Sequence, residues 1–183
     1  MKKLFKKTWF ALLLCVVGVV ASTLLNTRVK FGPLCEDVRA SLYQTDANGT
    51  SLRFELEDYC SCQDTLIALA SSQGIDTDSA VEARDALRTL LSTEGVTAHK
   101  LYEGYAAVLA ETQALTAALG EHPLGTHDSA TLQRCLSSLE SAQTAIEGFG
   151  YNAGLDEFLR KYDRLPTNAL AAAVGIRYPE RFS

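Results

Sequence analysis

The side chains best suited to chemistry are three cysteines, Cys60, Cys62 and Cys135. Thiolates bind soft metal ions and exchange with disulfides, so a Cys-x-Cys pair with a third thiol indicates a thiol- or metal-dependent module. On a helix Cys60 and Cys62 would point to different sides, which disfavours a bridge between them. Cys35 brings the set beyond the N-terminal segment to an even number, which outside the cytoplasm allows disulfides in any of three connectivities. Free or buried thiols are the simpler interpretation.

No second motif adds catalytic chemistry to these thiols. The histidines His99, His122 and His127 are scattered, and none pairs with a carboxylate at the spacing of a zinc site. No glycine-rich loop precedes a lysine, and there is no Gly-x-Ser-x-Gly elbow. The acidic run at residues 55–58 is typical of a solvated helix face. We therefore predict a protein that is not an enzyme, with no catalytic, cofactor-binding or metal-binding residue.

The composition indicates a helical, acidic domain behind a basic N-terminus. The net charge of −5 includes an N-terminal lysine cluster, so the remaining chain is more negative still. An acidic domain argues against nucleic acid as a partner. Ala, Leu, Ser, Thr and Glu dominate, and the chain has only four prolines. These features predict an all-α fold.

Apolar residues recur with helical spacing through most of the chain. The run from Leu52 to Ala70 keeps to one helical face, and Gly74 should end that helix. From Ala80 to Leu119 the alternation of three and four residues does not lose phase at Gly95. This predicts one helix of about 40 residues, roughly 60 Å long. A break at Gly95 that gives two helices is the alternative.

The last periodic segment runs from Leu132 to Leu165, and its phase slips by one residue near Gly148 to Gly154. A bend or a close approach to a neighbouring helix is expected there. Pro166 should end the segment, and a short helical turn is expected at 168–174. Together these helices predict an antiparallel bundle of three to four long helices.

Five polar residues interrupt the apolar faces. They could form a buried polar layer or conduit, or they could simply fix the register of a bundle, and we favour the second interpretation. These residues are Gln63, Arg84, Glu94, Thr112 and Gln143.

The helical domain must be positioned by an N-terminal segment that has no charged residue from Thr8 to Thr27. Its length as a helix is about 30 Å, the thickness of the hydrocarbon core of a bilayer. We predict a membrane anchor at residues 1–30, crossing the lipid bilayer through residues 8–27, and a domain at 31–183. Pro33, after Gly32, should kink or break the helix where it leaves the membrane.

The flanking charges favour a cytoplasmic N-terminus and a domain outside the cytoplasm. The segment would then be a single-pass anchor in the cell membrane. A cleaved signal peptide is the alternative, with a site at Val19-Val20-Ala21, although the apolar run is long for one. Gly18 and Ser22 form a small-xxx-small pair that could support a homo-oligomer. The basic residues are Lys2, Lys3, Lys6 and Lys7 before the segment and Arg28, Lys30 and Arg39 after it.

The C-terminal tail carries the most distinctive pattern. Tyr151-Asn152 is followed by an apolar helix, by Leu165-Pro166 and by a terminal Phe182, with Asn168, Ala171 and Gly175 between them. This pattern resembles the C-terminal signature of the LemA family, membrane-anchored helical-bundle proteins of bacteria. The resemblance implies an anchor, a bundle, and no enzymatic activity or cofactor. We expect a protein-interaction or scaffold component of the cell envelope, whose protein partner the sequence does not identify.

The chain departs from the LemA pattern in places. The family's second Tyr-Asn pair corresponds to Phe158-Leu159, and the basic, proline-containing stretch of its second helix is replaced by an acidic, cysteine-containing one at 56–66. Family members are often drawn with the large domain inside the cell, which opposes the orientation that the flanking charges favour. The resemblance therefore implies a divergent member.

Overall fold

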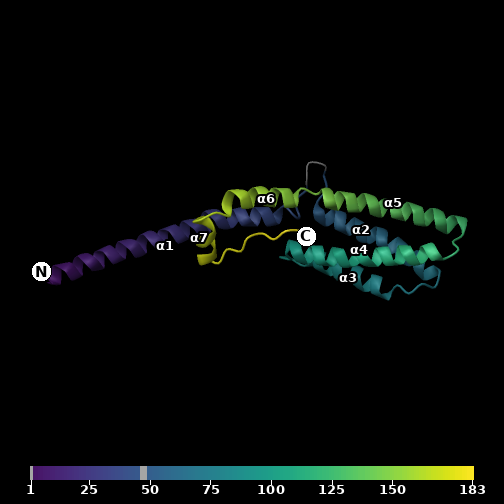
Figure 1. Cartoon of the computed structure of the whole chain (residues 1–183), viewed down its shortest axis with the longest axis horizontal. Coiled ribbons are helices and arrows are strands. Elements are labelled where there is room, and N and C mark those ends of the chain that lie inside the picture. Colours follow the sequence, from purple (N-terminus) through teal and green to yellow (C-terminus); the bar gives the residue numbers. More distant parts are fainter. Residues whose placement is uncertain (1, 46–48) are drawn as a thin grey trace. The chain divides into compact units, whose positions relative to one another are not determined.

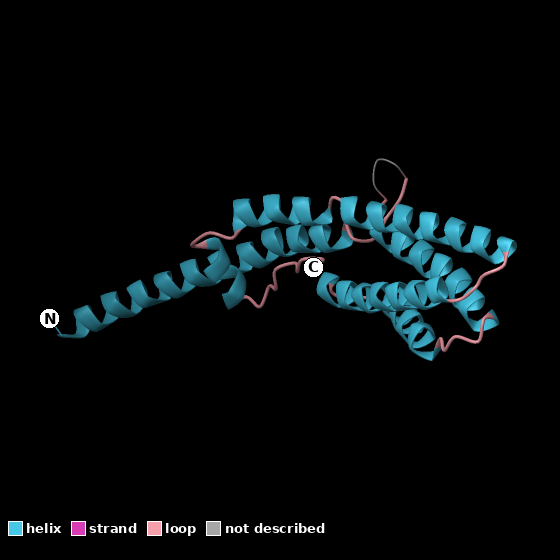
Figure 2. Cartoon of the chain, turned by 45° about the vertical axis from the view of Figure 1, so that its right-hand side comes forward, coloured by secondary structure: helices cyan, strands magenta, loops and turns pink. Residues whose placement is uncertain are grey.

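The computed structural model describes residues 2–45 and 49–183, and its regular structure is helical throughout (Figure 2). No strand occurs among the described residues, which confirms the all-α prediction. The helices are α1 (Lys2–Ala40), α2 (Leu52–Ser72), α3 (Asp78–Ser92), α4 (Ala98–Glu121), α5 (Thr126–Gly148), α6 (Tyr151–Tyr162) and α7 (Thr167–Ala173).

Helix α1 contains the apolar N-terminal segment. Its stretch Trp9–Ala40 is long enough and apolar enough to cross a membrane. Large apolar side chains from Trp9 to Val29 are exposed, whereas the core helix of a soluble protein buries such side chains. The sequence prediction of one long apolar N-terminal helix is confirmed.

Of the kink or break predicted at Gly32-Pro33, the break is wrong, because α1 continues through Pro33 to Ala40. Proline removes one backbone hydrogen bond and usually kinks or ends a helix. Here Phe31 and Cys35, on either side of it, are buried. Burial of side chains before and after Pro33 offsets the missing hydrogen bond, so the helix is held together by packing that local sequence does not reveal.

The chain forms two compact units, and the first combines Met1–Val38 with Leu155–Pro179. Within it α6 runs back along α1 (Figure 1). The Phe31 ring stands 5.7 Å from that of Phe158, 5.4 Å from that of Tyr162 and 5.6 Å from that of Tyr178. The Tyr178 hydroxyl donates to the Tyr162 carbonyl at 3.2 Å. These rings are the core of the first unit, and they bring Tyr162 level with Phe31.

The second unit combines Arg39–Gly154 with Glu180–Ser183. Its helices α2 to α5 run in alternating directions (Figure 1), and α2 packs on α3, α4 and α5, while α3 packs on α4. Each helix buries the apolar face that its sequence period predicts. The buried side chains include Leu52, Leu56 and Leu66 of α2, Leu87 and Leu91 of α3, Leu101, Val108 and Leu115 of α4, and Leu139 and Ile146 of α5.

The prediction of one 40-residue helix is wrong, and its alternative, a break at Gly95, is correct. Helix α3 ends at Ser92, α4 begins at Ala98, and Gly95 has φ +76°. The two helices lie against each other, and the Ser79 hydroxyl donates to Glu111 at 2.7 Å. A single long helix would leave its apolar face in water, whereas the turn lets the two halves cover each other.

Replacing Gly95 with alanine is expected to lower the free energy of unfolding by about 1–2 kcal/mol, because a Cβ is strained at positive φ. An added Cβ would meet no atom within 4 Å, so the cost is one of backbone conformation alone. Gly154→Ala is the matched control: this glycine lies in α6, with equally open space and no positive φ. It should stabilise by about 0.5–1 kcal/mol. Thermal unfolding of both variants measures the two changes in stability. Equal changes for Gly95→Ala and Gly154→Ala would contradict the conclusion that Gly95 is required for its positive φ.

Candidate functional site

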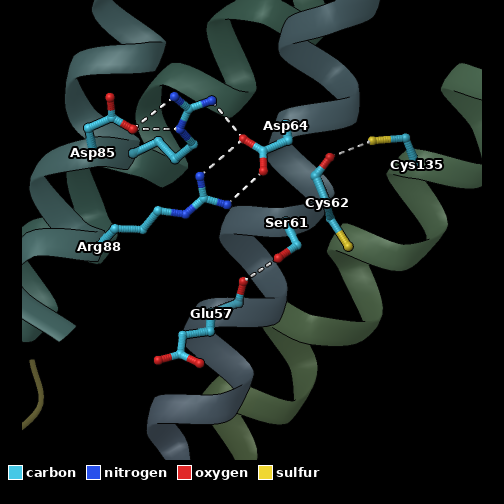
Figure 3. A network of polar contacts seen from close by, with 8 residues as sticks. Glu57, Ser61, Cys62, Asp64, Asp85, Arg88 and Cys135 are labelled. Carbon is cyan, nitrogen blue, oxygen red and sulfur yellow. Dashed lines mark hydrogen bonds and ion pairs between the residues drawn. The ribbon is translucent and has the colours of Figure 1, made fainter. Parts of the chain in front are cut away.

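The three predicted cysteines all lie in the second unit. Cys60 and Cys135 are buried, Cys62 is half-buried, and all are free thiols. The Cys135 thiol donates to the carbonyl oxygen of Cys62 at 3.2 Å, across the contact between α2 and α5 (Figure 3). Cys35 belongs to the other unit, in the buried part of α1. The α2–α5 contact therefore brings Cys62 and Cys135 close together.

The surroundings of these thiols keep them protonated at neutral pH. Burial raises the pKa of Cys60 to about 11, although the nearby Arg88 guanidinium lowers it. Burial also raises the pKa of Cys62 and of Cys135, with further increases from Asp58 near Cys62 and from Cys62 near Cys135. The thiolate is the nucleophile and the metal ligand, so these groups are weak in both roles. Among the described residues no group of three or more His, Cys, Asp or Glu side chains is placed to hold a metal ion.

Alkylation of the folded protein at neutral pH should modify Cys60 about 100-fold more slowly than the unfolded chain, from the lower thiolate fraction alone. The reason is the rise in pKa from 9.0 to about 11. Burial therefore contributes stability below pH 9 that is lost as the pH rises from 9 to 11. Site-resolved mass spectrometry after timed alkylation measures the rates, with half-buried Cys62 as the internal comparison. Equal rates at Cys60 and Cys62 would refute the assignment.

A charge network joins α2 to α3 beside these thiols. The Asp64 carboxylate accepts from Arg84 at 2.6 Å and from Arg88 at 2.6 Å (Figure 3). Arg84 also donates to Asp85 at 2.9 and 2.8 Å. The Arg84 side chain is only 15% exposed, whereas that of Asp64 is 40% exposed. The two arginines and two aspartates of this network neutralise one another, and their ion pairs fix α3 against α2.

The sequence interpretation found only one member of the network, Arg84, as a polar interruption of an apolar face. The available signal was the four-residue spacing of Arg84 and Arg88, which places both on one face of a helix. It could not identify Asp64, which is 20 residues from Arg84. Which carboxylate a basic face meets depends on how two helices pack.

Asp64→Asn is expected to lower the free energy of unfolding by about 1–2 kcal/mol, because it leaves two arginines without their shared carboxylate and solvent screens part of the loss. Urea unfolding of the detergent-solubilised chain measures the change. Asp58→Asn is the control, since Asp58 is an exposed carboxylate on the same helix. The network would be of no consequence to stability if the two variants unfolded at the same urea concentration.

A second polar group lies inside the packing of α2 against α4. The Gln63 amide donates to the Val108 carbonyl at 3.3 Å, and the Thr112 hydroxyl donates to the same carbonyl at 2.8 Å. The Tyr59 and Tyr105 rings meet edge to face, 5.4 Å apart. Among the described residues Gln63 Oε1 and the Tyr105 hydroxyl have no hydrogen-bond partner. Burial raises the pKa of Tyr105, so this hydroxyl stays protonated.

Of the five polar residues that interrupt the apolar faces, Gln63 and Thr112 are buried. Arg84 belongs to the charge network, Glu94 is exposed, and Gln143 donates to Glu147 at 2.8 Å. The buried pair forms a small polar contact at one level of α2 and α4. Only the Gln63 hydrogen bond crosses between the two helices, so sliding α2 along α4 would break it and leave a further buried polar group unpaired.

Three residues of the tail pattern, Tyr151, Asn152 and Phe182, come together in the second unit, whereas those between positions 165 and 175 belong to the first. The Asn152 side chain forms two hydrogen bonds with the backbone of Phe182: it donates to the carbonyl at 2.8 Å and accepts from the amide at 3.0 Å. The Tyr151 hydroxyl donates to the Glu180 carbonyl at 2.7 Å. The Phe182 ring packs against Tyr102 and Tyr105 at 5.4 and 6.2 Å. We call Tyr151, Asn152 and Phe182 the tail clamp.

The histidines are placed separately. The imidazole Nδ1 of His99 lies 2.9 Å from the backbone carbonyl oxygen of Ser183, and its Nε2 lies 3.5 Å from Glu103. His122 and His127 are exposed. His99 therefore lies beside the end of the tail, next to the tail clamp.

Comparison of the chain with protein-family models, with curated proteins and with solved structures found no significant match.

Proposed function

We propose that this chain is a membrane-anchored helical-bundle protein of the LemA type, without enzymatic activity, that serves as a scaffold or protein-interaction component of the bacterial cell envelope. The observation that carries the proposal is α1, whose large apolar side chains from Trp9 to Val29 are exposed. Burying such side chains gains about 1.5–3 kcal/mol each, which favours lipid over water around the helix. Residues 8–27 cross the bilayer once, and α2–α5 form the antiparallel bundle.

The tail clamp supports the likeness to the LemA family. The resemblance rests on Tyr151, Asn152 and Phe182 among other residues. Asn152 is hydrogen-bonded to the backbone of Phe182, 30 positions away, at 2.8 and 3.0 Å, and Tyr151 is hydrogen-bonded to that of Glu180 at 2.7 Å. The clamp's purpose is structural, since its polar side-chain atoms are used to hold the backbone of the tail.

The state of the reactive groups supports a non-enzymatic function. A nucleophilic thiol needs a lowered pKa, and burial raises that of Cys60, Cys62 and Cys135. The Asp64 carboxylate is occupied by two arginines. Neither group is prepared for acid–base or nucleophilic chemistry.

The membrane part of the proposal is tested on intact cells. The lysines before residue 8 favour a bundle outside the cytoplasm, so an external protease should remove the domain while residues 8–27 stay in the membrane fraction through carbonate extraction. A protected domain would reverse the orientation. Release of the whole chain by carbonate would refute the anchor.

The interaction part is tested by site-specific photocrosslinking in intact membranes. Phe54 of α2 is the best position, because its side chain is 57% exposed and apolar, a composition that interfaces favour. A photoreactive amino acid at position 54 should give one dominant crosslinked protein, and the same amino acid at exposed Arg134 of α5 should not. Equal crosslinking at both positions under every growth condition would refute a specific partner at this surface.

A further inference from the structure

The unit that contains α1 gathers exposed basic side chains around one level of that helix. Phe31 lies four residues beyond Thr27, the end of the uncharged segment, and α6 runs back along α1 so that Tyr162 meets Phe31. The acidic side chains at positions 36, 37 and 156 lie beyond that level, whereas Glu157 and Asp163 lie among the basic residues. Exposed basic residues lie close to that level: Arg28 and Lys30 of α1 on the side of the apolar segment, Arg160 and Lys161 in the last turn of α6, and Arg164 just after it.

The basic residues at the end of α6 surround a shallow hollow of about 380 Å³, lined by Glu157, Arg160, Lys161 and Arg164. In the part of the chain that the structure describes, neither Arg160 nor Arg164 forms an ion pair, and the Lys161 ammonium lies 5.2 Å from the centre of the Tyr162 ring. Asp163 lies among them and accepts from the Asn168 side chain at 3.5 Å. Three of its four lining side chains are cationic and one is anionic, so the hollow carries a net positive charge that favours phosphate groups.

The loop after α6 contains an exposed apolar side chain, that of Leu165. Leu165 is 81% exposed, more than any other large hydrophobic residue in the described chain, including those of the apolar segment. It follows Arg164 directly. An exposed leucine beside unpaired arginines is the composition of a peripheral membrane contact, in which the apolar side chain enters the interface and the bases meet the headgroups.

The spacing along the helix places this loop at the membrane surface. The four residues from Thr27 to Phe31 raise Phe31, and with it Tyr162, about 6 Å above the hydrocarbon edge. Three further residues reach Leu165, a span of at most about 10 Å. In both views the loop after α6 lies on the side of the α6 C-terminus that is nearer the N-terminal part of α1 (Figures 1 and 2). The interfacial layer is about 5–8 Å deep, so Leu165 can reach it.

We propose that Arg160, Lys161, Arg164 and Leu165 form a docking surface for the anionic phospholipid headgroups of the bilayer that α1 spans. We call these four residues the lipid-facing patch. The inference rests on the proposed function, because it requires α1 to be inserted. It adds a second attachment, in which the end of α6 rests on the surface beside the anchor. The charge of the patch selects anionic lipid, and Leu165 limits its depth to the interface.

The test uses the full chain, reconstituted into vesicles of phosphatidylcholine alone or of phosphatidylcholine with phosphatidylglycerol at 7:3. The chain has a single tryptophan, Trp9 in α1, so its quenching by brominated lipid reports insertion of the anchor. The double variant Trp9→Phe/Leu165→Trp moves the only tryptophan to the loop. Acrylamide quenching and the emission maximum then report whether position 165 is in water or at the interface.

The expected result is a blue shift and protection from acrylamide at position 165 with phosphatidylglycerol, and much less of both without it. Each basic residue near an anionic surface favours docking roughly fivefold. In the same background, Arg160→Glu/Arg164→Glu should therefore shift the docked-to-undocked ratio by on the order of 25-fold or more. The matched control, Lys100→Glu/Arg134→Glu, changes the same number of exposed charges in the other unit and should leave protection unchanged.

The outcomes separate the two proposals. If brominated lipid does not quench Trp9, the anchor and the proposed function fail together with the inference. If Trp9 is quenched but position 165 is equally exposed to acrylamide in both vesicles, the anchor stands and the lipid-facing patch is refuted. Protection that is equal in both vesicles and unaffected by Arg160→Glu/Arg164→Glu would also overturn it, because charge would then have no part in docking.

Discussion

Phe31→Ala is expected to lower the free energy of unfolding by about 3–5 kcal/mol, the largest effect of any single truncation in the unit that contains α1. Phe31 is 5% exposed, and its ring contacts those of Phe158, Tyr162 and Tyr178. Alanine would remove the ring on which the other three converge. It would also leave a cavity next to Pro33, where the helix already lacks one backbone hydrogen bond.

The measurement is thermal unfolding of the full chain in detergent micelles, with amide hydrogen exchange of α6 and α7 as the local readout. Exchange should accelerate in α6 and α7, because they are held to α1 by these rings. Val29→Ala is the control on the same helix: its side chain is 70% exposed, and the change should stay within about 0.5 kcal/mol. Protection of α6 that survives Phe31→Ala would show that the aromatic contacts do not hold this unit together.

Asn152→Ala is expected to lower the free energy of unfolding by about 2–3 kcal/mol and to release the last residues of the chain. The Asn152 side chain satisfies both the amide and the carbonyl of Phe182, at 3.0 and 2.8 Å. Alanine would leave these two partly buried backbone groups without partners, which costs more than the hydrogen bonds themselves contribute. The Phe182 ring would then lose its fixed position against Tyr102 and Tyr105.

Digestion with carboxypeptidase measures the release of the tail directly, and urea unfolding measures the free energy. Asn168→Ala is the matched control, because both hydrogen bonds of the Asn168 side chain are exposed and local: it donates to Asp163 at 3.5 Å and accepts from the Ala169 amide at 2.8 Å. Asn152→Asp should lie between the two, since it keeps the acceptor for the Phe182 amide and loses the donor. Unchanged digestion of Asn152→Ala would mean that the tail is held by Phe182 packing alone, and the tail clamp would lose its central member.

The elements that sequence predicted well are those fixed by local periodicity or composition. The apolar positions of α2 and α4 repeat every three or four residues, and Leu56, Leu66, Val108 and Leu115 are buried as that period requires. The uncharged segment in α1 was equally easy to predict, because the length of an apolar segment can be read from the sequence without knowledge of tertiary contacts. The end of α2 before Gly74 was predictable because glycine readily adopts the positive φ that ends a helix, and Gly74 has a φ of +76°.

The candidate site was only partly predictable. The sequence identified the three cysteines, and it identified Tyr151, Asn152 and Phe182 through their resemblance to a family signature. It could not pair Asp64 with Arg84 and Arg88, nor Asn152 with Phe182. Each of these contacts joins residues at least 20 positions apart, so its existence depends on which faces of two segments meet.

The sequence by itself determined that the protein is helical, that it begins with one long apolar helix, and which faces of the later helices are buried. Only the tertiary structure decided where the helices end. The preference of proline for helix ends predicts that α1 stops at Pro33, yet α1 continues to Ala40 because Phe31 and Cys35 are packed in the core. Unbroken periodicity continues through Gly95, yet the chain turns there because two apolar faces are more stable against each other than in water. Period and composition are local properties, whereas the choice between continuing and turning is settled by the free energy of contacts that only the folded chain makes.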